Sequence, residues 1–173
     1  MTGIFMEGHM DADIRIRAVG PPERDLLIGM YDRFDPLGGA FGLPPRTAEA
    51  RREWIGSALG HKVNVAAFSA AGEVVGHCFV AAGDEPGSAE LAIFVHQDSR
   101  RRGVGAALVK AALECGSAAG LRRVRAMTSS DNRAALRLVR SCGFRLTSVF
   151  PAAELEIYLP PTWVANPSCP AVA

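Results

Sequence analysis

The chain has 173 residues, of which 49% are hydrophobic and 21% charged, a length and composition that fit one domain with a hydrophobic core. Its 19 Lys and Arg residues nearly balance 18 Asp and Glu residues, for a net charge of +1, so nothing predicts binding to nucleic acid or to an acidic membrane. No apolar run approaches the roughly 20 residues of a membrane span, and the N-terminus lacks the pattern of a signal peptide. The four cysteines form no CxxC pair, which favours reduced core thiols and a cytoplasmic location.

Residues 1–13 show no periodicity and are interpreted as a loose leader, and residues 160–173 as a proline-rich tail. The span 14–159 between them is predicted to be a single domain. It begins with an alternating strand at 14–19 and continues with a helix at 22–34, where proline suits the first turn. Glycines and prolines predict a loop at 35–45, and Thr47 is expected to cap a second helix.

The second half of the domain alternates strands and helices. Two strands joined by a tight turn are predicted at 63–69 and 73–81, and a central strand at 89–95. A helix at 106–115, a strand at 121–127, a helix at 133–141 and two last strands at 144–150 and 154–159 follow. The central strand–helix–strand unit should form a right-handed parallel crossover. The expected fold class is therefore α/β, with a mixed sheet of six to seven strands flanked by about four helices.

The segment 89–106 predicts an anion site. An apolar strand leads into a basic turn with Gly103 and Gly105, and an amphipathic helix follows. The unpaired N–H groups and the positive dipole end of a helix that begins there favour a phosphate group. Taken alone the glycine pair is equally explained by close packing of a helix on a strand.

A second motif resolves this ambiguity. Asn132-x-x-Ala135-x-x-Leu138 leads to Gly143-Phe144 one strand later. With Arg100-x-x-Gly103-x-Gly105, this pattern resembles the GNAT superfamily of acetyl-coenzyme A-dependent N-acetyltransferases in element order from residue 14 to residue 159. The resemblance implies a sheet whose central strand and next strand separate to admit the pantetheine arm, with acetyl-CoA as the co-substrate. The residues that it assigns to the coenzyme are Phe94, Val95, Arg100, Arg101, Arg102, Gly103, Val104, Gly105, Ala106 and Asn132.

Glu90 is the predicted catalytic residue. Amine acetylation needs a deprotonated amine, and in many GNAT enzymes a glutamate on the central strand is the general base. Alternation places Glu90 on the face of Ala92 and Phe94, where desolvation is expected to raise its pKa. Its alternative role is that of a strand-end carboxylate paired with Arg122 or Arg123.

Other candidates for the chemistry are weaker. His96 is an alternative base, and His77 is expected to be a polar strand residue that reaches solvent. Many family members carry a tyrosine acid where this chain has Val139, so no general acid is assigned, and Ser141 or water is left as a substitute. No cluster has metal-ligand spacing, so no metal is expected.

The acceptor is the least determined part of the prediction. Residues 31–34 and 89–92 resemble the bacterial Pat-type protein lysine acetyltransferases, so a protein lysine is the first expectation. The alternatives are a small-molecule amine (a polyamine, an aminoglycoside or an amino acid) and a non-catalytic module that senses acetyl-CoA. Family members are often dimers, which makes a homodimer an open expectation.

Overall fold

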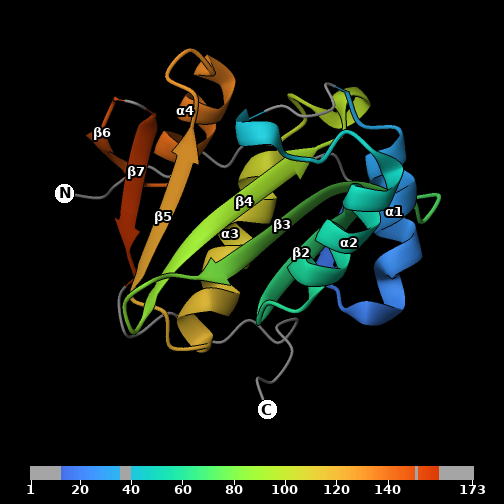
Figure 1. Ribbon diagram of the computed structural model, residues 1–173, viewed down its shortest axis with the longest axis horizontal. Coiled ribbons are helices and arrows are strands. Elements are labelled where there is room, and N and C mark those ends of the chain that lie inside the picture. The colour runs from blue at the N-terminus through green and yellow to red at the C-terminus, as the bar shows by residue number, and fades with distance from the viewer. Residues whose placement is uncertain (1–12, 36–39, 151, 160–173) are drawn as a thin grey trace.

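The computed structural model describes residues 13–35, 40–150 and 152–159. The predicted tail and all of the predicted leader except Asp13 lie outside the described residues. One mixed sheet of seven strands forms the centre of the molecule, in the order β1-β2-β3-β4-β5-β7-β6 (Figure 1). The strands are β1 (Arg15–Ala18), β2 (Val63–Phe68), β3 (Val74–Ala82), β4 (Ser88–Val95), β5 (Arg123–Thr128), β6 (Arg145–Ser148) and β7 (Ala153–Tyr158).

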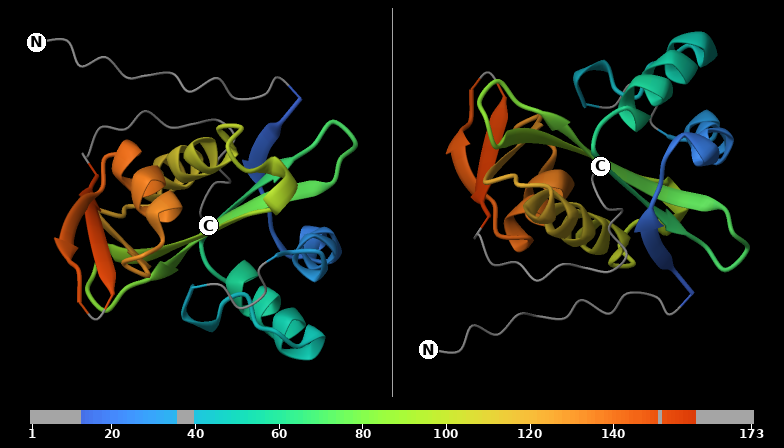
Figure 2. Two further views of the ribbon diagram at one scale, coloured as in Figure 1. Left: turned by 90° about the horizontal axis from the view of Figure 1, so that it is seen from above. Right: turned by 90° about the horizontal axis from the view of Figure 1, so that it is seen from below.

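Four α-helices cover the sheet in two layers, α1 and α2 on one face and α3 and α4 on the other (Figure 2). They are α1 (Arg24–Asp32), α2 (Ala48–Leu59), α3 (Val104–Ala118) and α4 (Arg133–Ser141), and short 3-10 turns occupy Pro21–Glu23, Ala40–Gly42 and Gln97–Ser99. None of the helices in the described ranges has the length and apolarity needed to cross a bilayer.

The predicted fold is confirmed in class, element order and strand pairing. β4 and β5 are the parallel pair, connected through α3, and every other pair of neighbouring strands is antiparallel. Thr47 caps α2 as predicted, because its hydroxyl accepts from the Ala50 N–H at 3.3 Å. Observed boundaries differ from the predicted ones by a few residues. The helix predicted over 22–34 is α-helical only over Arg24–Asp32, because its proline-containing first turn is 3-10.

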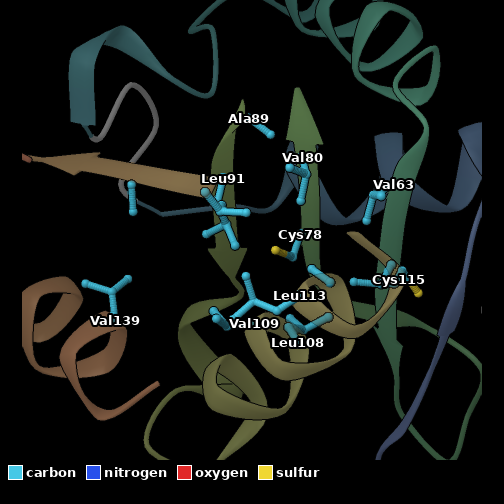
Figure 3. Close-up of a cluster of buried hydrophobic side chains, with 14 of the residues drawn as sticks. Val63, Cys78, Val80, Ala89, Leu91, Leu108, Val109, Leu113, Cys115 and Val139 are labelled. Atoms are coloured by element: carbon cyan, nitrogen blue, oxygen red, sulfur yellow. The ribbon is translucent and has the colours of Figure 1, made fainter. Parts of the chain in front are cut away.

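The larger core lies between α3 and the sheet. Figure 3 shows Leu108, Val109 and Leu113 packed from α3 against the sheet, and all three side chains are buried. The cysteine prediction holds in part: Cys78 and Cys142 are free thiols, whereas Cys115 is disulfide-bonded, which contradicts the expectation of reduced thiols.

One buried arginine joins the two helices of the other layer. Arg51 of α2 donates from Nε and Nη2 to the Asp32 carboxylate at the end of α1. Its Nη1 donates to the backbone carbonyls of Pro45 and Arg46, at 3.1 and 2.8 Å. The charge is therefore paired and its donors are used, which is the condition under which a buried guanidinium is tolerated.

A row of hydrogen-bonded polar side chains lies beneath the layer formed by α1 and α2. The Asn64 amide donates to the carbonyls of Ala58 and His61, at 3.0 and 2.8 Å, so its oxygen is left to accept from His77 Nε2 at 3.1 Å. His77 Nδ1 then accepts from the Tyr31 hydroxyl at 2.9 Å. His77 is fully buried, so the prediction that it reaches solvent is wrong. The pattern gave no sign of this because its partners are distant in sequence.

The buried histidine should make stability depend on pH. Burial lowers the pKa of His77 to about 3, whereas an unfolded histidine titrates near pH 6.5. Between these values the unfolded chain binds a proton that the folded chain does not. The stabilisation that depends on a neutral His77 should therefore be fully present above pH 6.5. As the pH falls from 6.5 towards 3, the free energy of unfolding should decrease by up to ~1.4 kcal/mol per pH unit because of this group. Urea titrations at several pH values between 4 and 8 give the free energy of unfolding of the wild type and of His77→Gln. If this free energy changes equally with pH in the two proteins, the prediction is contradicted.

Candidate functional site

The central feature of the site is the point where β4 and β5 cease to pair. β5 pairs with β4 only from Ser88 to Leu91, whereas β3 pairs with β4 as far as Val95. In Figure 1 the two strands start side by side and separate towards their C-terminal ends. The remaining four residues of β4 thus have a strand partner on one edge only. This is the separation that the sequence resemblance implied.

The register between β3 and β4 shows which backbone groups of β4 face the separation between β4 and β5. The His96 N–H donates to the carbonyl of Val75 in β3 at 2.9 Å. Because the N–H and C=O of alternate residues in an antiparallel pair point to the same neighbour, those of Phe94 also face β3. The groups of Ile93 and Val95 point to the other edge. The resemblance assigns Phe94 and Val95 to the coenzyme, and the register turns the backbone groups of Phe94 towards β3 and those of Val95 and Ile93 towards the separation. The sequence alone does not reveal which backbone groups of a strand face which neighbour.

The N-terminus of α3 follows at the end of β4. Gly103 precedes the helix in the left-handed conformation, with φ 78°, and Arg101 shares that region with φ 61°. The first helical bond runs from the Ala107 N–H to the Gly103 carbonyl at 3.1 Å. The N–H groups of Val104, Gly105 and Ala106 therefore precede the helical ladder, as expected of an anion-binding helix end.

Gly105 is required for close packing, whereas Gly103 is required for its left-handed backbone conformation. A Cβ atom at Gly105 would lie 2.9 Å from Leu138 Cδ2 and 3.7 Å from Val95 Cγ2. The glycine thus permits α4 to approach the first turn of α3. Close packing, one of the two explanations offered for the glycine pair, is therefore observed at Gly105, and the anion site at the start of α3 stays a prediction.

The three arginines of the turn have different surroundings. Arg101 and Arg102 are exposed on the turn. Arg100 instead donates from Nε to the Val95 carbonyl at 3.0 Å and from Nη2 to the Asp35 carbonyl at 2.6 Å. Its predicted contact with a phosphate is therefore not supported, because the guanidinium is directed to the backbone at the end of α1.

Glu90 lies on the open part of the face that α1 and α2 cover elsewhere. Its side chain is 57% exposed, and Oε1 accepts from Arg125 Nη2 on β5 at 3.2 Å. The desolvated surroundings expected for this carboxylate are absent. The predicted alternative of an arginine pair is correct in kind, but the partner is Arg125 rather than Arg122 or Arg123, because parallel register places Glu90 beside Arg125.

Aromatic rings line the covered part of this face. The Phe94 ring meets those of Tyr31, Phe34 and Trp54 edge-on, at centroid distances of 5.5, 6.0 and 5.4 Å. Burial raises the pKa of the Tyr31 hydroxyl well above its ordinary value, so this tyrosine stays neutral.

His96, the alternative base, caps the turn after β4, and its Nε2 is buried without a hydrogen-bond partner in the described structure.

Residues near α4 complete the site. The Asn132 side chain caps α4 by accepting from the Ala135 N–H at 3.1 Å, so the capping role is observed. Val139 is buried in the core and the Ser141 hydroxyl donates to the Leu138 carbonyl at 2.6 Å. Thr128, in the part of β5 beyond its pairing with β4, has a buried hydroxyl that is unpartnered within the described ranges.

These features fit acetyl-CoA. The diverging strands leave peptide groups for the amides of a pantetheine arm, and the helix end suits a pyrophosphate. Within the part of the chain that is described, no three His, Cys, Asp or Glu side chains are grouped as metal ligands.

Comparison with known proteins identifies the family. The model of the acetyltransferase (GNAT) family matches residues 28–144, so the chain belongs to this family. It is an acetyl-CoA-dependent N-acetyltransferase, an acyltransferase that acts on an amine. L-methionine sulfoximine/L-methionine sulfone acetyltransferases from Pseudomonas paraeruginosa and Pseudomonas aeruginosa are each 29% identical over 147 residues, covering 79% of this chain and 83% of theirs.

Solved structures share the fold. The GNAT domain of S. lividans PAT has a TM-score of 0.72 at 20% identity, covering 84% of this chain and 90% of its own. A GNAT superfamily phosphinothricin acetyltransferase from Sinorhizobium meliloti in complex with acetyl-CoA has a TM-score of 0.71 at 17% identity, covering 90% and 97%.

The role of the α3 N-terminus can be tested at Gly103. Gly103→Glu should weaken acetyl-CoA binding by at least about 100-fold, because it adds bulk and a negative charge where phosphate is expected. Gly72→Glu is the matched control, since Gly72 has a φ of 80° in the turn between β2 and β3 and open space around its Cα. Calorimetric titration with acetyl-CoA compares the two. Wild-type affinity in the Gly103 variant, or equal weakening in both, would contradict the assignment.

Proposed function

We propose that this enzyme acetylates the primary amine of a small amino-acid-like molecule. The observation that carries the proposal is the 29% identity, over most of both chains, to two enzymes named for L-methionine sulfoximine and L-methionine sulfone. The acceptor expected first from the sequence, a protein lysine, is therefore moved to second place. Its support is limited to the resemblance of residues 31–34 and 89–92 to Pat-type enzymes.

The proposed donor site uses backbone groups more than side chains. Ile93 and Val95 hold the pantetheine arm and the thioester from the free edge of β4, and the N–H groups of Val104, Gly105 and Ala106 hold the pyrophosphate. Arg101 and Arg102 add positive charge at the turn, and Asn132 adds a contact from the start of α4. The cytoplasm is the proposed location, since the donor is a metabolic thioester.

Acetyl-CoA supplies a thioester carbonyl that an amine can attack. The Ile93 N–H faces the separation of the strands and is the proposed donor to the oxygen on which negative charge develops. Glu90 is the proposed general base. Because its side chain is exposed and bonded to Arg125, it takes the ammonium proton of the acceptor through water rather than by direct contact.

Departure of the thiolate needs little help. A thiol of cysteine type has a pKa near 8.5, which makes its anion a moderate leaving group at neutral pH. Val139 donates no proton, and the Ser141 hydroxyl is occupied by Leu138. We therefore assign no protein acid to this step.

The base assignment predicts the kinetics of Glu90→Gln. This variant should lose about 100-fold in kcat near pH 7, a typical contribution of general base catalysis, while it binds acetyl-CoA normally. Glu85→Gln is a matched control, because Glu85 is 69% exposed and pairs with Arg123 at 2.8 Å, outside the residues assigned to the site. Release of the coenzyme A thiol, measured with Ellman's reagent, gives kcat for the wild type and for both variants. Loss of less than threefold in Glu90→Gln would exclude Glu90 as the base.

The acceptor assignment predicts the outcome of a substrate panel. L-methionine sulfoximine, L-methionine sulfone and L-phosphinothricin should each support thiol release, with kcat/KM at least about 100-fold above that of spermidine or a lysine-containing peptide. The same wells without protein give the background. A peptide that outperformed all three amino acids would restore the protein-lysine interpretation.

A further inference from the structure

Two side chains of the turn after β4 hold the end of α1. Arg100 donates from Nη2 to the Asp35 carbonyl at 2.6 Å and from Nε to the Val95 carbonyl at 3.0 Å. Gln97 donates from Nε2 to the Arg33 carbonyl at 2.9 Å and accepts from the Asp35 N–H at 3.1 Å. These four bonds, which we call the α1 bracket, join residues 33–35 to the strand that borders the donor site.

In every bond of the α1 bracket, the partner of the Arg100 or Gln97 side chain is a backbone group. The contacts therefore do not depend on which side chains residues 33 and 35 carry, but they fix where this chain segment lies. Arginine suits the position because its planar guanidinium can reach two carbonyls that belong to different elements, which a single ammonium group does less well.

The bracket also sets the position of an aromatic wall. Phe34 lies between the two bracketed residues and is buried, with its ring 6.0 Å from that of Phe94 on β4. The Arg100 guanidinium lies 5.5 Å from the centre of the Phe34 ring. One side chain thus contacts the carbonyl of Val95 on the donor side and the ring of Phe34 on the face that also carries Glu90.

We propose that Arg100 and Gln97 are positioning residues for the acceptor, which hold the end of α1 at a fixed distance from the thioester-binding edge of β4. The inference rests on the proposed function, because it assigns the face of α1 and Glu90 to the acceptor. It gives Arg100 a role different from phosphate binding, although Arg100 belongs to the motif that marks the coenzyme site.

Steady-state kinetics separate these roles. Gln97→Leu removes two bracket bonds without a change of charge, and should raise the KM of the amine acceptor about 3- to 10-fold, the range expected for one or two lost hydrogen bonds. Arg100→Met should do the same, and Arg100→Lys should recover part of the loss because it keeps one donor. The Kd of acetyl-CoA, measured by calorimetry, should change by less than about twofold in all three variants.

Other outcomes would overturn the inference. An unchanged acceptor KM in both Gln97→Leu and Arg100→Met would do so. A tenfold rise in the Kd of acetyl-CoA in Arg100→Met, with no effect of Gln97→Leu, would return Arg100 to the phosphate site.

Amide hydrogen exchange tests the bracket without any acceptor. The Asp35 N–H should exchange slowly in the wild type and at least about 10-fold faster in Gln97→Leu, because its acceptor is then missing. If the substrate panel gives no turnover but this difference is found, the acceptor assignment fails and the bracket stands. Equal Asp35 exchange in the two proteins would refute the bracket, whatever the enzyme acetylates.

Discussion

The site depends on an interrupted pairing between two parallel strands. β4 is held by β3 along its whole length and β5 is held by β7 as far as Thr128, so neither strand can bend to restore the missing ladder. A strand edge without a partner strand offers N–H and C=O groups to a ligand. A pantetheine arm presents amides of its own, so its proposed contact with the edge of β4 depends on the backbone arrangement and can persist while the surrounding side chains change.

Packing explains how the separation is maintained. Gly105 lets Leu138 reach the first turn of α3 at the level of Val95, so α4 lies close to the end of β4. Val139 is buried on the same helix. Val139 stands where the family resemblance led us to expect a tyrosine acid. Its side chain instead packs in the core, and it has no proton to donate.

The sequence predicted the elements and the crossover because each depends on local periodicity, caps and glycines. It did not predict properties that depend on pairing between distant segments. The contacts of His77 with Tyr31 and Asn64 require the sheet register. The exposure of Glu90 follows from the extent of α1 and α2, which periodicity does not give. The partner of Arg100 lies 65 positions away along the chain, and the motif that includes Arg100 suggests a different one.

Arg51 fixes both ends of the loop between α1 and α2. Its guanidinium ties Asp32 before the loop to the carbonyls of Pro45 and Arg46 at the far side, so both ends are anchored by one side chain. Closing a loop whose ends are already fixed costs little more when residues are added, since the entropy grows only with the logarithm of length. Changes of length between the bracketed Asp35 and Pro45 should therefore cost the sheet little. A change of acceptor through this loop would then need no new fold.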